Sequence, residues 1–373
     1  MAKASRKSTE VLAVELGERT IKVLQGPSRR KNVTANRVLM VDTPEGSVDQ
    51  YVITDWEKLK TAFKHEVFTR TKSKKIMFVM DHPDVIKRRL TLNVVDDSDL
   101  PGLVKYRLGE YLGFDMDAYI VQFSKIEESE DARGVPILDV FVSAIPKQIV
   151  ESYVGFCEEL SVEPYVLDTK TNVLQSLLLE GVTVNEEIDL GDYQTVCFIE
   201  MGQEQVEVNI YENGYFRYNH IATQGILGIF DTLADRFHLQ PDEIEDLILS
   251  HSPDQLSEDH PGDSRFSPAD DSIPAGTEDV AAIMQSYQVE LINWIDGIHR
   301  VLLMFGGRQD RINQILAYGD GFTYPGTADM LRHRIRSDIQ VIESISSWNA
   351  SKRSDRLGSE LYRFVNLIGL ISK

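Results

Sequence analysis

Two stretches of the chain repeat one pattern. The segment VLAVELGERTIKVL, starting at residue 11, aligns without gaps with VCFIEMGQEQVEVN, starting at residue 196. Each has an apolar run, an acid-x-Gly turn and a second alternating run, which predicts two strands joined by a tight turn. The matched acids and glycines are Glu15 with Glu200 and Gly17 with Gly202. The repeat indicates an internal duplication in which two related lobes open with the same hairpin; a coincidental match of two hairpins is the alternative.

The pattern around the first hairpin predicts a mixed α/β lobe with an insertion. Apolar runs predict strands over 10–16, 20–25, 37–43 and 74–80, and apolar residues at helical spacing predict a helix over 55–68. From residue 81 a small α/β unit follows, with strands over 87–94, 119–128 and 137–146 and helices over 100–114 and 147–160. A strand over 163–169 then returns the chain to the first lobe.

The chain after residue 193 predicts a second lobe. We expect helices over 225–239, 242–249, 281–305, 327–335 and 359–371, and a strand over 312–318. The stretch 252–279 is rich in Pro, Ser, Asp and Gly, which predicts a mobile acidic loop. The predicted boundaries are 1–80 and 166–192 for the first lobe, 81–165 for the inserted subdomain, 193–230 and 306–358 for the second-lobe core, 231–305 for its helical subdomain, and 359–373 for a terminal helix packed on the first lobe.

Composition and residue patterning argue against several functions. The chain carries 59 acids against 39 bases, a net charge of −20, and this excess disfavours nucleic acid as a partner because a polyanion would be repelled. No apolar run approaches the ~20 residues of a membrane span, and no signal peptide is recognisable, so we expect a cytoplasmic protein. Cys157 and Cys197 lie in apolar stretches typical of core residues. The histidines, including His251 and His260, lack metal-ligand spacing, so no metal site is expected on them.

The repeated turns suit phosphate binding in principle. Glycine lets the backbone approach a phosphate and direct N–H groups at it, and the neighbouring acid can hold a magnesium ion through water. A third glycine-rich turn, AYGDGFTYPG, lies between a predicted strand and a predicted helix, where it would suit a nucleoside and its inner phosphates. Two such hairpins in related lobes suggest a shared cleft.

The order of these elements resembles the actin-like ATPase superfamily and, within it, the type IV pilus assembly protein PilM family, which is related to FtsA. The shared features are the first acid-x-Gly hairpin, an inserted subdomain, the strand with Val166-Leu167-Asp168, the second hairpin and the turn YGDGFTYPG, and they cover nearly the whole chain. The resemblance implies an actin-like fold of two ribonuclease-H-like lobes. It also implies ATP-site residues at Glu15, Gly17, Lys22, Glu200, Gly202, Gln205, Gly319 and Gly321.

Three departures weaken the implied nucleotide site. The superfamily usually has Asp where Glu15 and Glu200 stand, a hydroxyl residue where Gln205 stands, and glycine where Asp320 stands. An extra anion at ~4 Å from a phosphate is repelled by about 4 kcal/mol at an effective dielectric of 20. Lys22 remains, but no Lys/Arg cluster replaces what is lost. We therefore expect ATP and magnesium binding to be weak or absent and hydrolysis to be unlikely. We interpret EMGQEQ as a tight turn between two strands and not as a phosphate-binding loop.

The resemblance also implies a scaffold. In the family, the inserted subdomain and the first lobe form a groove that binds the cytoplasmic N-terminal segment of PilN, an inner-membrane protein. Members are thought to form a ring beneath the membrane and to connect it with a PilB-like assembly ATPase. Here the candidate partner residues are a basic strand and a helix with tyrosines, namely Lys87, Arg88, Arg89, Tyr106, Tyr111 and Leu112. A solvated strand face and core helix residues are the alternative interpretation.

Other functions stay open. An actin-like ATPase or small-molecule kinase would need a carboxylate base in the cleft, for which Asp168 is the candidate. A type II secretion component shares the fold but continues into a membrane span. An FtsA-like filament former usually ends in an amphipathic membrane helix, and the residues of 359–373 could be mistaken for one, although their apolar face suits packing on the first lobe.

Overall fold

The computed structural model describes residues 9–28, 33–113, 115–251, 277–305, 312–336, 338–346, 348–350 and 360–373. The predicted acidic loop 252–279 therefore lies largely outside the described residues, although α7 already begins at Thr277. The chain divides into two compact units, of which unit 1 comprises 1–196, 209–219 and 342–373, and unit 2 comprises 197–208 and 220–341.

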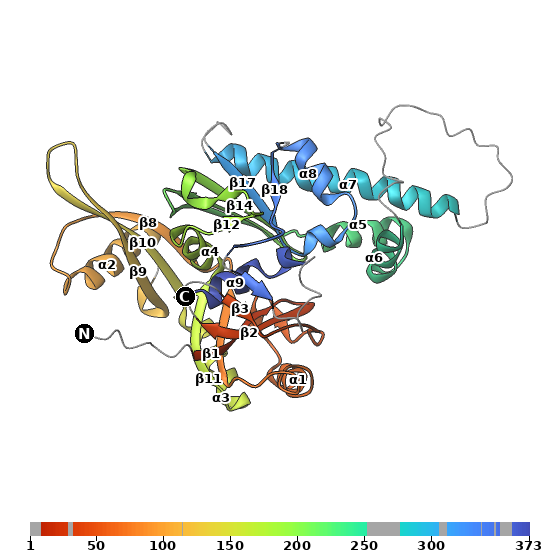
Figure 1. Ribbon diagram of the computed structural model, residues 1–373, viewed down its shortest axis with the longest axis horizontal. Coiled ribbons are helices and arrows are strands. Elements are labelled where there is room, and N and C mark those ends of the chain that lie inside the picture. Colours follow the sequence, from red (N-terminus) through yellow and green to blue (C-terminus); the bar gives the residue numbers. More distant parts are fainter. Residues whose placement is uncertain are drawn as a thin grey trace. The chain divides into compact units, whose positions relative to one another are not determined.

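Unit 1 is built on a five-stranded sheet in the order β11-β7-β1-β2-β4 (Figure 1). The strands are β1 (Thr9–Leu16), β2 (Thr20–Ser28), β4 (Arg37–Asp42), β7 (Lys75–Met80) and β11 (Glu163–Thr169). β1, β2 and β4 form an antiparallel meander, whereas β7 and β11 run parallel to β1. The strands predicted from apolar runs are confirmed. A strand buried on both faces has a nearly continuous run of apolar residues, which can be recognised in the sequence.

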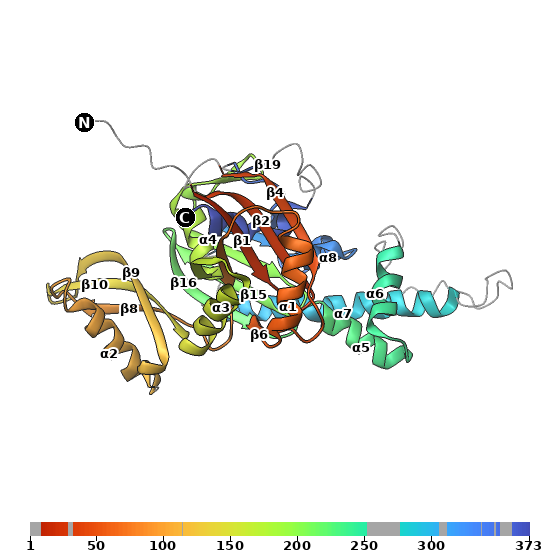
Figure 2. The ribbon, with the colours of Figure 1, turned by 90° about the horizontal axis from the view of Figure 1, so that it is seen from below.

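Helices cover both faces of this sheet (Figure 2). Alternate residues of β1, such as Leu12 and Val14, pack with α1 (Trp56–Ala62) and α3 (Lys147–Leu160). The other face is covered by α4 (Lys170–Leu179) and α9 (Val365–Ile371). The predicted helix 55–68 is an α-helix followed by a π-helical turn, Phe63–Val67. The predicted helix 359–371 is wrong in its first part, because a short 3₁₀ turn, Leu361–Arg363, precedes α9. The helix α4 was not predicted.

Unit 1 also contains a separate three-stranded antiparallel sheet in the order β8-β10-β9 (Figure 1). Its strands lie between β7 and β11 in the sequence. It consists of β8 (Ile86–Asn93), β9 (Tyr119–Glu130) and β10 (Pro136–Pro146). The helix α2 (Leu100–Leu112) covers one face, where Leu90 and Leu92 of β8 pack with Val104 and Leu108. Gly113 ends α2 in a left-handed conformation, with its N–H bonded to Gly109 O.

The second five-stranded sheet has the order β16-β15-β14-β17-β18. Its strands are β14 (Thr195–Met201), β15 (Val206–Glu212), β16 (Tyr215–Ala222), β17 (Gln314–Tyr318) and β18 (Gln340–Val341). The boundary between the units crosses β14, β15 and β16. Unit 2 adds α5 (Leu227–Phe237), α6 (Pro241–Ser250), α7 (Thr277–Met304) and α8 (Thr327–Arg334). Within the described parts of the chain, no helix has the length and apolarity needed to cross a bilayer.

The remaining elements are short. They are the strand pairs β3 (Val33–Ala35) with β19 (Trp348–Ala350), β5 (Val48–Asp49) with β6 (Val52–Ile53), and β12 (Thr183–Val184) with β13 (Ile188–Asp189). None of these was predicted, since two- and three-residue strands carry too little periodicity to be recognised.

Candidate functional site

The first acid-x-Gly turn joins β1 to β2 and bonds to its own chain. Gly17 N–H donates to Thr20 O (3.0 Å), and Gly17 O accepts a hydrogen bond from Thr43 Oγ1 (2.8 Å). Lys22 lies opposite Glu15 in the strand register and is buried. The amide and carbonyl of Gly17 thus already have partners in the protein.

The Glu15 carboxylate forms a buried ion pair. Lys170 Nζ lies 3.0 Å from Glu15 Oε1, and the two side chains are 2% and 5% exposed. The same ammonium donates to Tyr51 Oη (2.6 Å) and lies 4.8 Å from the centroid of that ring. Asn366 of α9 approaches Oε1 more loosely, at 3.5 Å. We call these four residues, Glu15, Lys170, Tyr51 and Asn366, the Glu15 cluster.

The second acid-x-Gly turn joins β14 to β15 and packs against the start of α5. Gly202 N–H donates to Gln205 O (3.0 Å), which closes the turn. Two carbonyls of this turn accept hydrogen bonds from the residues just before α5. Gly225 N–H donates to Glu204 O (2.8 Å) and Ile226 N–H donates to Gly202 O (3.2 Å). A Cβ on Gly202 or Gly225 would collide with backbone atoms of this turn. The glycines are therefore required by close backbone packing.

The third glycine-rich turn rests on the second hairpin. A Cβ at Gly319 would lie 2.6 Å from Met201 O, and one at Gly321 would lie 2.8 Å from the same oxygen. Glu200, next to Met201, is buried and accepts a hydrogen bond from Tyr318 Oη (3.4 Å). The predicted residues of the second hairpin and third turn thus lie together in unit 2, and Asp320 between the glycines is buried with them.

These residues fit a magnesium nucleotide poorly. A magnesium ion needs oxygen ligands in near-octahedral order, whereas the Glu15 carboxylate already pairs with an ammonium ion. One indication favours a ligand: Glu15 Oε2 and Gln205 Nε2 are buried with no hydrogen-bond partner among the described residues. Glu15 Oε2, however, belongs to the same carboxylate as the paired Oε1, so the ammonium would repel a dication there. The Glu15 carboxylate is therefore unsuited to binding magnesium.

Two residues of the basic run in β8, Lys87 and Arg89, are paired with acids of the protein itself. Lys87 is buried, is ion-paired with the buried Asp81 and donates to Asn219 Oδ1 (3.2 Å). Arg89 binds Asp139 through Nε (3.0 Å) and Nη2 (2.6 Å). The interpretation of Lys87 as part of an exposed basic surface is not compatible with its burial, because the alternation of a strand turns it toward β16.

Two candidate partner residues are accessible. Arg88 is exposed, with one weak bond to Lys87 O (3.4 Å), and Tyr106 of α2 is 62% exposed with its hydroxyl donating to Glu110 (2.7 Å). Both lie on the α2 side of the β8-β10-β9 sheet, since Arg88 alternates with Arg89 and shares the face of Leu90. The side chains of Tyr111 and Leu112 lie outside the described residues.

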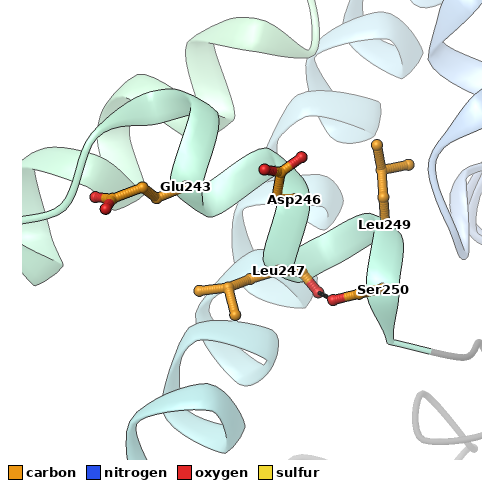
Figure 3. A pocket seen from close by; sticks show the side chains of 5 residues that line it. All are labelled: Glu243, Asp246, Leu247, Leu249 and Ser250. Carbon is orange, nitrogen blue, oxygen red and sulfur yellow. Dashed lines mark hydrogen bonds between the residues drawn. The ribbon is translucent and has the colours of Figure 1, made fainter.

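Other candidate sites offer little. Asp168 accepts a hydrogen bond from Asn172 Nδ2 (2.9 Å) and pairs with Lys373, so it is not a free base. The described residues contain no group of three acids, histidines or cysteines placed to hold a metal ion. Figure 3 shows an open hollow on α6, lined by Glu243, Asp246, Leu247, Leu249 and Ser250. Its carboxylates would repel a phosphate.

Sequence reasoning missed Lys170, Tyr51 and Asn366. Lys170 begins α4 after the N-cap Thr169, whose Oγ1 accepts from Asn172 N–H (3.3 Å). That Thr-Lys step could have marked a helix start. Nothing local predicts that three segments so distant in sequence meet at one carboxylate.

The two repeated hairpins, each opening an α/β sheet, and the inserted three-stranded sheet define a protein of the actin-like class. Solved structures share this fold. A chain titled "PilM-PilN type IV pilus biogenesis complex" superposes with a TM-score of 0.71 at 15% identity over 98% of both chains. The ethanolamine utilization protein EutJ from Carboxydothermus hydrogenoformans gives 0.50 at 9% identity, over 98% of this chain and 90% of that one.

The family model described as type IV pilus assembly protein PilM matches residues 13–259, more than half of the chain. The chain therefore belongs to the PilM family, and it acts in type IV pilus assembly. No curated protein sequence matches it.

Proposed function

We propose that this protein is a cytoplasmic scaffold that binds the N-terminal cytoplasmic segment of a PilN-like inner-membrane protein. Family membership carries this proposal, together with a fold shared over 98% of both chains with a structure titled as a PilM–PilN complex. The protein would then be peripheral at the inner membrane through its partner. Connection to a PilB-like assembly ATPase and assembly into a ring of copies are further parts of the proposal.

We place the partner surface on the inserted subdomain, with the predicted boundaries 81–165. Arg88 and Tyr106 support this choice because both are accessible on the α2 side of the small sheet. A guanidinium can pair with an acidic group of an extended segment, and an exposed tyrosine supplies apolar contact with one polar end. Lys87 and Arg89 would hold the subdomain's own structure through Asp81 and Asp139.

The subdomain is anchored to β16, which supports its use as a rigid binding platform. Phe141 of β10 packs on Phe216 with ring centroids 4.8 Å apart, and Lys87 donates to Asn219. A site on rigid elements loses less conformational entropy on binding than one on a loop.

We propose that ATP hydrolysis has no part in this function. The paired Glu15 and the glycines packed on Met201 support this, since both use groups that a nucleotide would need. A nucleotide, if it binds, would only stabilise one arrangement of the protein. A steady-state phosphate-release assay with MgATP tests this: turnover that depends on Glu15 or Glu200 would contradict it.

Peptide titration tests the scaffold. The probe is a labelled synthetic peptide with the N-terminal cytoplasmic sequence of the PilN-like protein from the same genome, followed by fluorescence anisotropy. We expect saturable binding that weakens about tenfold, or 1.4 kcal/mol, in Arg88→Glu and in Tyr106→Ala. Matched controls are Arg133→Glu at the β9–β10 turn, where the arginine side chain is 83% exposed, and Tyr165→Ala, 46% exposed.

The outcomes separate two claims. If the wild-type protein binds no such peptide, the scaffold proposal fails. If it binds and the two variants match their controls, the partner surface lies elsewhere.

A further inference from the structure

The Glu15 cluster contains a charge arrangement that the scaffold function does not require. Lys170 and Glu15 are both nearly inaccessible, with side chains 2% and 5% exposed. Burying an ion pair is costly unless its geometry is good and its remaining atoms are bonded. Here the ammonium has the Glu15 carboxylate at 3.0 Å and the Tyr51 hydroxyl at 2.6 Å, so its position is well defined. The other carboxylate oxygen, Glu15 Oε2, has no hydrogen-bond partner among the described residues.

The backbone adopts an unfavourable conformation at the turn that brings the Tyr51 hydroxyl to this ammonium. Gln50 and Tyr51 form the two-residue turn between β5 and β6, with φ of +44° and +65°. Such a turn favours Asn-Gly, because both residues have positive φ. Tyr51 brings instead a phenol hydroxyl that accepts a hydrogen bond from Lys170 Nζ (2.6 Å). Strained residues of this kind persist where surrounding contacts over-determine them.

Two hydrogen bonds hold that strained turn. Gln50 N–H donates to Glu18 Oε1 (2.9 Å), and Tyr153 Oη donates to Tyr51 O (2.7 Å). Burial, reinforced by the negative charge of Glu15, raises the pKa of Tyr153 above its ordinary value. Tyr153 therefore keeps its proton and remains a donor.

The cluster supplies what a bound cation would supply to Glu15. It places the Lys170 ammonium beside the carboxylate, bonds that ammonium to the Tyr51 hydroxyl, and adds a weak donor from Asn366 (3.5 Å). The buried Lys22 lies opposite Glu15 in the strand register and adds a second positive charge on this hairpin. A divalent ion approaching Glu15 would meet the ammonium, and magnesium also gives up its waters reluctantly.

We infer that Lys170 is a built-in cation that balances the Glu15 carboxylate in place of magnesium, so that this hairpin is completed without metal. The inference deepens the proposed function and rests on it, because a scaffold without hydrolysis can dispense with the metal. It assigns Lys170 and Tyr51 a positioning role that neither the family match nor the structural neighbours assign.

Magnesium titration of four purified proteins tests the inference. They are the wild-type protein, Glu15→Gln, Lys170→Met, and the double variant. The melting temperature is measured with 0 to about 10 mM magnesium chloride, at an ionic strength held constant with potassium chloride. A ligand that binds only the native state stabilises it by RT ln(1 + [L]/Kd) and so raises the melting temperature. Magnesium that binds to surface acids should shift the melting temperature of Glu15→Gln as much as that of the wild-type protein, so the difference between the two shifts reports on Glu15.

We expect the wild-type protein and Glu15→Gln to respond to magnesium equally. Lys170→Met should melt lower, and magnesium should restore part of the loss; the double variant should recover stability and lose the magnesium response. A Glu15-dependent response in the wild-type protein overturns the inference, and so does a folded Lys170→Met that ignores magnesium. Should Lys170→Met not fold, the wild-type and Glu15→Gln pair still decides.

A second measurement does not depend on any variant. Acetic anhydride modifies accessible lysines, and mass spectrometry of the native protein should show Lys170 modified at least tenfold less than the exposed Lys58, whose side chain is 55% exposed. Equal modification of Lys170 and Lys58 would contradict the burial of the Lys170–Glu15 ion pair. Failure of peptide binding would reject the scaffold and leave these results standing, so the two failures are distinguishable.

Discussion

Gly319→Ala tests whether the third glycine-rich turn is a packed corner. Gly319 has φ of +112°, and a Cβ there would lie 2.6 Å from Met201 O and 2.9 Å from its carbonyl carbon. Real Cβ atoms essentially never come that close to other atoms, so either the turn or β14 must move. Both are backbone, and neither can rotate away as a flexible side chain could.

The expected cost has two parts. A non-glycine residue in this region of φ costs about 1–3 kcal/mol, and forcing extra volume into a packed site costs about 1–3 kcal/mol more. The sum is roughly 2–6 kcal/mol, which is a large fraction of the about 5–15 kcal/mol by which a protein is stable.

Urea unfolding followed by tryptophan fluorescence measures this cost, because Trp294 of unit 2 is buried and bonded to Gln224 O (3.0 Å). Gly46→Ala is the matched control, since Gly46 has φ of +68° with nothing within 4 Å of its Cβ. It should lose only about 1–2 kcal/mol from the left-handed backbone. If Gly319→Ala loses no more than Gly46→Ala, the close packing on Met201 is not real and a ligand role for the glycine regains support.

Three further predictions concern the buried charges, the pH dependence and the thiols. Lys87→Met should cost about 3–5 kcal/mol in urea unfolding because it removes the ammonium that is ion-paired with the buried Asp81, and adding Asp81→Asn should recover much of that loss. Equal stability of the single and the double variant would contradict the Lys87–Asp81 ion pair. Hydrogen bonds from Arg334 and Arg336 lower the pKa of Asp296 and Asp338 below 3.8, so their stabilisation is complete above that pH and is lost as the pH falls through the lower folded values. Asp296→Asn should therefore reduce the loss of stability between pH 5 and pH 3, which are about one unit either side of the ordinary aspartate pKa. Burial raises the pKa of Cys157 to about 12 and that of Cys197 further, so neither thiol should react with Ellman's reagent at pH 8 until urea unfolds the chain; fast labelling of the native protein would show that they are accessible.

The sequence predicted which residues form the turns of the candidate site, but it did not predict what those residues contact. The acid-x-Gly turns were recognised because turn chemistry is local, and the departures at Gln205 and Asp320 already argued against a phosphate cradle. The same reasoning grouped Lys87 with Arg88 and Arg89, since a sequence shows three charges in a row. Strand alternation and the acids at 81 and 139 then separated them.

What the sequence alone determined was the set of strands and helices with strong apolar periodicity, the duplicated hairpin and the family resemblance, because each depends on residues close together in the chain or on their order. Only the tertiary structure decided what surrounds the hairpin acids. The Glu15 cluster joins β1, the β5–β6 turn, α4 and α9, and a buried carboxylate takes its charge balance from whichever groups folding brings within a few ångströms, at any separation in sequence.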